Sequence, residues 1–167
     1  MENKLADGIL TVCKLLNKHS VQYIIVGGAA VALHGYFRQS VNFGGTAIEI
    51  PDLDFWYNPT YENYFKLLNA LEELGQDVRE FKEEQAPNSK KSFFRYQFEN
   101  FAADFLPGLK APLIFRSCFD NRDVVTLEGV NISFINYSDL ITDKQANSRP
   151  KDIVDIEQLE LKKRKND

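Results

Sequence analysis

Apolar and polar positions in the first quarter of the chain follow helix and strand periods in turn. The first 18 residues carry apolar side chains on one side of a helix and predict an amphipathic helix. The β-branched, apolar run 21–26 predicts a buried strand. Gly27-Gly28 separates this strand from a short helix over 29–34, which Gly35 ends. The chain therefore opens as helix, strand, glycine turn and helix.

The next stretch joins an irregular segment to a two-faced strand. Residues 36–51 contain Gly44-Gly45 and Pro51 and predict irregular structure. Residues 52–57 alternate between an apolar set and a set that holds two aspartates, as in a strand with two different faces. A helix follows, with Thr60 as N-cap, a leucine stripe, and Gly75 after its end.

Two hairpins and two helices are predicted for the second half. The charged segment 82–91 predicts an exposed loop. Strands over 93–98 and 101–106 meet at Glu99-Asn100, and a second hairpin turns at Glu128-Gly129. Helices then begin near Ser138 and at Pro150. Together these elements predict one α/β (α+β) domain over residues 1–167, in which helices pack on a mixed β-sheet.

Composition narrows the class of protein. Apolar residues make up 44% and charged residues 26%, as in ordinary globular domains. Because 24 acids face 20 bases, for a net charge of −4, an extended nucleic-acid surface is not expected. The apolar run 21–33 is too short to cross a bilayer, and the first residues lack the form of a secretion signal. We therefore expect a cytoplasmic protein with no membrane partner, in which Cys13 and Cys118 are reduced structural thiols.

Asp52 and Asp54 form the clearest chemical signal in the chain. Side chains at positions i and i+2 of a strand share one face, so the two carboxylates stand side by side. Such a pair favours a cation between its members, and oxygen ligands suit Mg²⁺ or Mn²⁺. The alternative is a strand face that is merely solvated.

Asp104 adds a third acid in an otherwise apolar strand. An aspartate there is costly to bury unless it is paired or bound to a metal. Next to the strand of Asp52, it would complete a cluster able to hold two metal ions and drive in-line attack at phosphorus. The alternative is an acid at a strand end before the Pro107-Gly108 turn.

The pair Gly27-Gly28 stands between a strand and a helix. Absent side chains let backbone N–H groups approach a phosphate there, although a plain tight turn is the alternative. The chain has neither the GxxxxGK[ST] P-loop nor the GxGxxG fingerprint. These absences argue against P-loop kinases and ATPases and against Rossmann dehydrogenases.

Basic side chains near the carboxyl end are candidate phosphate ligands. Lys144, Arg149 and Lys151 could neutralise a triphosphate, and Arg38 could contact phosphate or acceptor. The alternative is a solvated connection between two helices, in which Asp152 interacts favourably with the helix dipole.

The ordered set of these motifs resembles the nucleotidyltransferase superfamily. It is most similar to small bacterial members, including those of toxin–antitoxin and abortive-infection systems. The resemblance touches most of the chain from residue 21 to residue 159. It rests on VGGAAVALHGYFR (26–38), DLDFWYNPT (52–60) with Glu62-Asn63, the strand acid Asp104, Asp139-Leu140-Ile141, Lys144, and RPKDIVDI (149–156).

The resemblance implies transfer of a nucleoside monophosphate from a nucleoside triphosphate to a hydroxyl acceptor. The acceptor would be a protein side chain, a tRNA end or a small molecule. Two Mg²⁺ or Mn²⁺ ions would bind at the three aspartates, the glycine pair would open the nucleotide site, and Lys144, Arg149 and Lys151 would lie near the nucleotide. This chain departs from the family in the extra segment 39–50, which places 23 residues between Gly28 and Asp52. The segment would reshape or cover the pocket.

Two other functions stay open at this point. One is a non-catalytic, antitoxin-like or regulatory module that keeps the fold and binds a partner. The other is a metal-dependent phosphodiesterase or nuclease. The catalytic hypothesis requires the three acids to converge in space, whereas an ion pair between one of them and an arginine would favour the non-catalytic scaffold.

Overall fold

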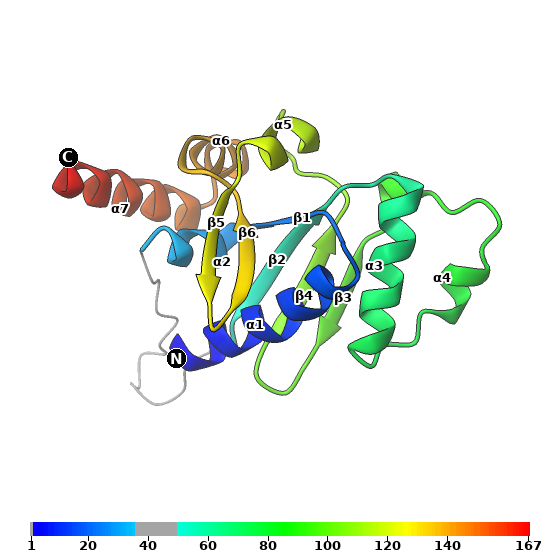
Figure 1. Ribbon diagram of the computed structural model, residues 1–167. Helices are drawn as coiled ribbons and strands as arrows, with labels where there is room; N and C mark the ends of the chain where they lie inside the picture. The colour runs from blue at the N-terminus through cyan, green and yellow to red at the C-terminus, as the bar shows by residue number, and fades with distance from the viewer. Residues whose placement is uncertain (1, 36–49) are drawn as a thin grey trace.

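The computed structural model describes residues 2–35 and 50–167, and in them a six-stranded mixed sheet (Figure 1). The strand order is β3-β4-β2-β1-β6-β5. The pairs β2–β4 and β1–β6 are parallel, and the other three pairs are antiparallel. The strands are β1 (Tyr23–Val26), β2 (Asp52–Tyr57), β3 (Phe94–Gln97), β4 (Ala102–Leu106), β5 (Asp123–Leu127) and β6 (Val130–Phe134).

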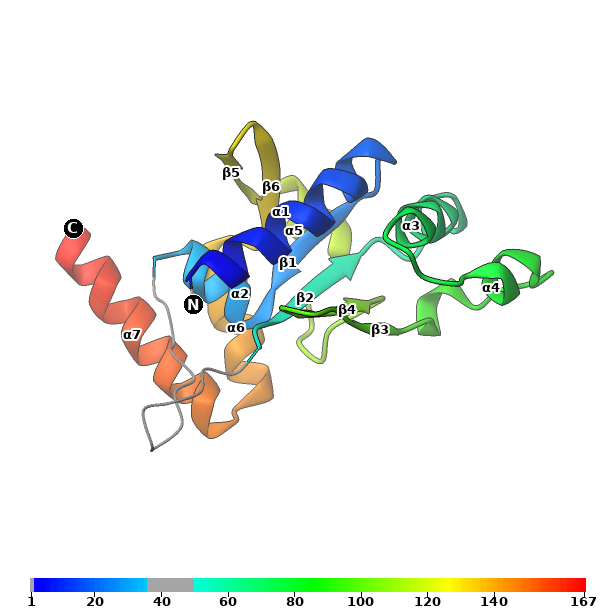
Figure 2. The ribbon, with the colours of Figure 1, turned by 90° about the horizontal axis from the view of Figure 1, so that it is seen from below.

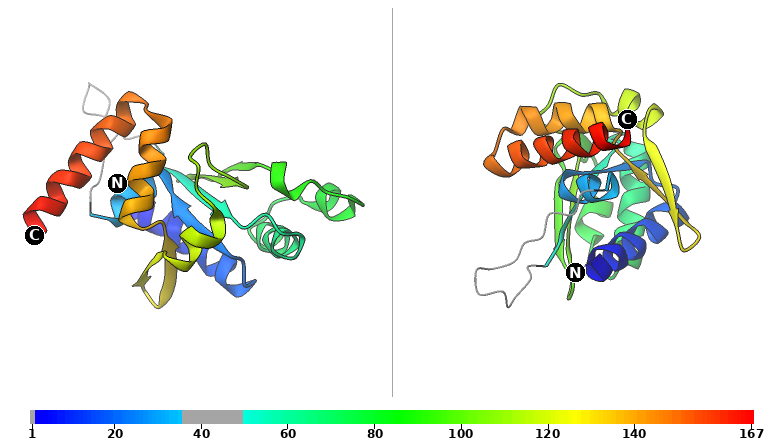
Figure 3. Two further views of the ribbon diagram at one scale, coloured as in Figure 1. Left: turned by 90° about the horizontal axis from the view of Figure 1, so that it is seen from above. Right: turned by 90° about the vertical axis from the view of Figure 1, so that its left-hand side faces the viewer.

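Helices pack around this sheet. The two longest helices are the first and the last elements of the chain. Helix α1 packs on β6 and α3, α2 packs on β1, β2 and α6, and α6 packs on α7. Figures 2 and 3 show α7 projecting away from the sheet, on the opposite side of the molecule from α3 and α4. The helices are α1 (Glu2–Lys18), α2 (Gly27–Leu33), α3 (Tyr61–Glu73), α4 (Arg79–Glu83), the 3-10 helix η1 (Ser89–Lys91), α5 (Phe115–Asp120), α6 (Tyr137–Asn147) and α7 (Pro150–Asn166).

The predicted mixed α/β architecture is confirmed, with several local differences. The segment expected as a loop over 82–91 holds the end of α4 and the 3-10 helix η1. Helix α5 was not predicted, because its six residues are too few for a helical period to show. The predicted cap of α3 is confirmed, since the Thr60 hydroxyl accepts a hydrogen bond from Asn63 N at 3.2 Å.

The two faces of β2 have different surroundings. Leu53 and Phe55 are fully buried, and the Phe55 ring stacks on Phe105 with centroids 5.2 Å apart. Helix α1 covers this face closely, because a Cβ on Gly8 would lie 3.1 Å from Leu53 Cδ1. The two aspartates of β2 alternate with these core residues and therefore point to the other face of the sheet.

Over the described residues, none of the helices combines the length and the hydrophobicity needed to cross a bilayer.

Candidate active site

The parallel pairing of β2 and β4 brings the three predicted acids to one face of the sheet. In this register Asp54 lies opposite Asp104, and Asp52 lies opposite Ala102. Because side chains alternate faces along a strand, Asp52, Asp54 and Asp104 all point the same way. The strand of Asp104 is thus next to the strand of the Asp-Leu-Asp motif, which is the placement that a three-acid cluster requires.

The acids differ in their exposure to solvent and affect one another. The Asp52 side chain is 65% exposed, whereas that of Asp104 is 15% exposed. Burial, followed by the charges of Asp104 and Asp52, raises the pKa of Asp54 to about 6. Burial also raises the pKa of Asp104, against the opposing effect of the Arg95 guanidinium. A carboxylate held among others in this way favours a nearby cation.

Arg95 supplies such a cation and was not among the predicted site residues. It stands opposite Asp104 in the antiparallel pair of β3 and β4. Its Nη1 donates to Asp104 Oδ2 at 3.2 Å, and its Nη2 lies 3.8 Å from Asp52 Oδ1. The ion pair that would favour a non-catalytic scaffold is therefore present in this structure.

The chemistry of the acid cluster nevertheless fits a hard divalent cation. Carboxylate oxygens are the ligands that Mg²⁺ and Mn²⁺ prefer. Asp104 Oδ1 is buried and has no hydrogen-bond partner in the described part of the chain, so it retains an acceptor that a cation could use. As the side chains lie, no three His, Cys, Asp or Glu residues among those described are grouped closely enough to hold a metal. Metal binding would thus require the acids to draw together.

Gly27 brings the backbone directly against the cluster. It follows Val26, whose position in β1 is paired with Asp54 of β2. Its φ angle is +68°, and a Cβ built on it would overlap Asp54 Oδ2. The turn predicted at Gly27-Gly28 is absent, because both glycines belong to α2, which follows β1 directly. Gly27 and the acid pair, separated in the sequence, therefore meet in space, and only glycine fits this conformation beside the Asp54 carboxylate.

Replacing Gly27 by alanine is expected to lower the free energy of unfolding by about 2–4 kcal/mol, because backbone strain and steric overlap add. Gly75→Ala is a matched control, since Gly75 has a φ of +97° but no atom within 4 Å of an added Cβ. It should lose only about 1 kcal/mol. Urea unfolding of both variants measures the difference. Equal losses would contradict a steric role for Asp54.

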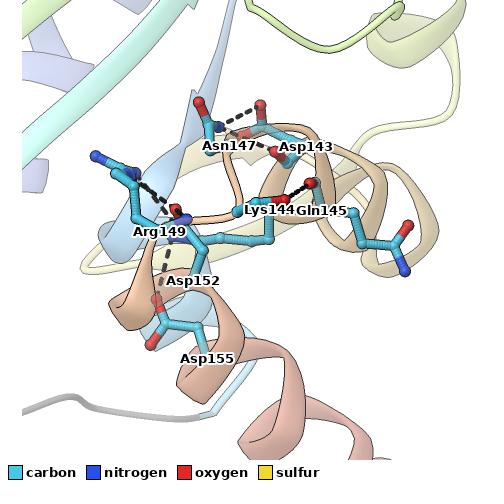
Figure 4. Close-up of polar contacts among 8 residues, drawn as sticks. Asp143, Lys144, Gln145, Asn147, Arg149, Asp152 and Asp155 are labelled. Atoms are coloured by element: carbon cyan, nitrogen blue, oxygen red, sulfur yellow. Dashed lines mark hydrogen bonds and ion pairs between the residues drawn. The ribbon is translucent and has the colours of Figure 1, made fainter.

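The α6–α7 corner contains a buried cluster of charges (Figure 4). The Lys144 side chain is only 2% exposed, and its Nζ lies 3.1 Å from both Asp152 Oδ1 and Asp155 Oδ2. Asp152 also accepts from the backbone N–H of Arg149 at 3.0 Å and from its Nε at 2.7 Å. The cluster ties the end of α6 to the first turns of α7.

The protonation states of Asp152 and Asp143 at this corner follow from these contacts. Burial alone would raise the pKa of Asp152, but hydrogen bonds from Arg149 and Lys144 lower it to about 2. Burial raises the pKa of Asp143, which also lies near Lys144 and Asp152. The Asp152 carboxylate thus stays ionised and is paired with the Lys144 ammonium and the Arg149 guanidinium.

The corner also faces the acid cluster across the site. The charges of Lys144 and Lys151 oppose the rise in the pKa of Asp54. The pKa of Arg149 is raised chiefly by its hydrogen bond to Asp152, and the charge of Asp54 adds to that rise. The structure therefore brings the late basic segment to the same region as the acids, although the two are far apart in the sequence. Lys151 is exposed and the Arg149 side chain is half exposed, so both can reach a ligand, whereas the Lys144 ammonium group faces Asp152 and Asp155.

Two predictions fall outside the described residues. The first is Arg38. The second is the extra segment 39–50, of which only Ile50 is described. Gly28, predicted beside Gly27 as a nucleotide-binding residue, lies in the first turn of α2.

Comparison with known proteins identifies a similar fold. No family model matches the chain, and no curated protein matches its sequence. The crystal structure of an antigenic nucleotidyltransferase-like protein from Paracoccidioides brasiliensis superposes with a TM-score of 0.53 at 13% sequence identity. The match covers 94% of this chain and 75% of that one. The chain thus has a nucleotidyltransferase-like fold, and the similarity concerns the fold alone.

Proposed function

We propose that this protein is a metal-dependent nucleotidyltransferase that moves a nucleoside monophosphate from a nucleoside triphosphate to a hydroxyl acceptor. The observation that carries the proposal is the convergence of Asp52, Asp54 and Asp104 on adjacent strands, with Gly27 against them. Three carboxylates on one face repel one another, and the Arg95 guanidinium contacts only two of them, so the cluster is costly to a fold that makes no use of it.

Each of these residues has a distinct role in the proposed reaction. Asp52, Asp54 and Asp104 would hold Mg²⁺ or Mn²⁺, and Asp104 Oδ1 is a candidate base for the proton of the acceptor hydroxyl. When bound, the cations would polarise the α-phosphate and neutralise its developing charge. Arg149 and Lys151, on the corner that faces Asp54, would balance the charge of the triphosphate.

The reaction is a substitution at phosphorus. The acceptor oxygen forms a bond to the α-phosphorus, and the bond from that phosphorus to the oxygen bridging it to the β-phosphate breaks. Pyrophosphate leaves with the electron pair, and the acceptor proton passes to a carboxylate. A protein side chain, a tRNA end and a small hydroxylated molecule are all acceptors of the required chemistry.

Binding of nucleotide with metal tests this proposal. At a hundred times its Kd, a ligand stabilises the native state by about 2.7 kcal/mol, which for a chain of this size corresponds to a rise in Tm of about 5 °C or more. We expect this rise with ATP or GTP in the presence of Mn²⁺, and its loss in EDTA. Transfer of label from the α-phosphate to a protein, tRNA or small-molecule acceptor then identifies the reaction. No shift and no labelled product would contradict the proposal.

The ion pair of Arg95 favours a second candidate function. If Arg95 is the permanent partner of Asp104, the protein is a non-catalytic, antitoxin-like or regulatory module that binds a partner through the same fold. The double variant Asp52→Asn, Asp54→Asn separates the two functions. A binding module keeps its biological effect in this variant, and a transferase loses it.

A further inference from the structure

Arg95 contacts two of the three acids from the edge of the sheet. It lies on β3, which pairs with β4 alone among the described strands, and its guanidinium spans from Asp104 to Asp52. Two carboxylates thus share one guanidinium, and the third acid, Asp54, lies opposite Asp104 in the sheet. The guanidinium stands where a divalent cation would also be attracted, because both are drawn by the same oxygens.

The contact leaves much of the cluster's binding capacity unused. Arg95 donates to Asp104 Oδ2, while Asp104 Oδ1 is buried and has no hydrogen-bond partner among the described residues. A guanidinium carries one positive charge, whereas a divalent cation carries two and accepts several oxygens at short range. Once drawn together, the three carboxylates would match a divalent cation better than the guanidinium that contacts two of them.

The contact is also weak enough to be displaced. The Arg95 side chain is 59% exposed, and its second contact, to Asp52, is long at 3.8 Å. Ion pairs of exposed arginines contribute little to stability, because water screens them and a long side chain loses freedom. Arg95 can move into solvent without disturbing the core.

We propose that Arg95 is a built-in counter-cation that a divalent metal ion must displace from Asp104 and Asp52, so that Arg95 sets the metal affinity of the site. This inference rests on the proposed function, since it takes the acid cluster to be the metal site. The arginine balances charge in the metal-free protein and weakens metal binding by competing for the same oxygens. Displacement of Arg95 by metal makes its ion pairs with Asp104 and Asp52 compatible with a catalytic site.

Direct titration with Mn²⁺, followed by electron paramagnetic resonance or calorimetry, tests the inference without any measurement of activity. Arg95→Met removes the charge and keeps an unbranched side chain. We expect it to bind Mn²⁺ about three- to tenfold more tightly than the unchanged protein, in line with the small contribution of an exposed ion pair. Arg116→Met is the matched control, since Arg116 is similarly exposed and pairs with Asp120 away from the cluster. It should bind Mn²⁺ as the unchanged protein does.

The outcomes separate the inference from the proposed function. Metal binding by the unchanged protein with no tightening in Arg95→Met would overturn the inference and leave the transferase proposal standing. Absence of Mn²⁺ binding in both proteins would overturn both. A melting curve in EDTA verifies that Arg95→Met is folded.

Discussion

Replacing Asp54 by asparagine is expected to abolish divalent-cation binding and, in the metal-free protein, to raise stability above pH 6. Asp54 lies between the other two acids and against the Gly27 backbone, so it is central to any metal site formed here. Loss of its carboxylate should remove several kcal/mol of transition-state stabilisation, or about a thousandfold in the rate of nucleotidyl transfer.

The sign of the stability change follows from the pKa of Asp54. Its pKa rises from 3.8 to about 6 on folding, chiefly through burial and then through the charges of Asp104 and Asp52. Between these values the folded state binds more protons than the unfolded state, so stability falls as pH rises through this range. Above pH 6 the full cost of the ionised group is present, about 1–3 kcal/mol. Asparagine carries no charge and escapes that cost.

Unfolding by urea at pH 4 and at pH 8, together with Mn²⁺ titration, checks both parts of this prediction. Asp54→Asn should exceed the unchanged protein in stability by about 1–3 kcal/mol at pH 8 and by little at pH 4. Asp52→Asn is the control, because its exposed side chain should change stability by less than about 0.5 kcal/mol while still weakening metal binding. Unaltered Mn²⁺ affinity in Asp54→Asn would contradict the proposed metal site.

The acid cluster could be predicted from the sequence because strand geometry is regular. A period of two places Asp52 and Asp54 on one face, and their apolar neighbours show which face is buried. Asp104 stood out as a charge inside an apolar strand. The partner strand itself could not be predicted from the sequence, since β2 and β4 are separated in the chain by α3, α4, η1 and β3, and local patterns do not determine which distant strands pair.

Arg95 was missed although its signal was present. The predicted hairpin turns at Glu99-Asn100, so Phe98 and Phe101 flank the turn, and three residues further along each strand lie Arg95 and Asp104. The structure has this pairing. A predicted turn therefore fixes which residues face each other, and an arginine opposite an unusual aspartate follows from counting.

Lys144 shows where local patterns mislead. Its place in a basic segment suggested either a phosphate ligand or part of a solvated connection between helices, but α6 and α7 pack together and bury it between Asp152 and Asp155. Helix periodicity detects apolar faces, and this interface is built partly from charges. Only the packing of the two helices reveals that the charges are partners.

Replacing Lys144 by methionine is therefore expected to lower the free energy of unfolding by about 3–5 kcal/mol, because it leaves carboxylates in the interior without their ammonium partner. Lys66→Met is the matched control, since Lys66 forms an ion pair with Glu62 on the surface of α3 and should change stability by less than about 1 kcal/mol. Unfolding by urea at pH 7 measures both. A stable Lys144→Met protein with weakened nucleotide binding would instead show that Lys144 contacts the nucleotide directly.

The pH dependence of this loss identifies its cause. The pKa of Asp152 is lowered to about 2: burial opposes the shift, and the hydrogen bonds of Arg149 and Lys144 outweigh it. A carboxyl group with a lowered pKa stabilises the folded state fully above its ordinary value of 3.8, and this contribution disappears as pH falls towards 2. The difference between Lys144→Met and the unchanged protein should therefore narrow over that range, since a protonated carboxyl group no longer needs the cation. A gap that stays constant from pH 7 to pH 2 would point to lost packing of the lysine side chain rather than to its charge.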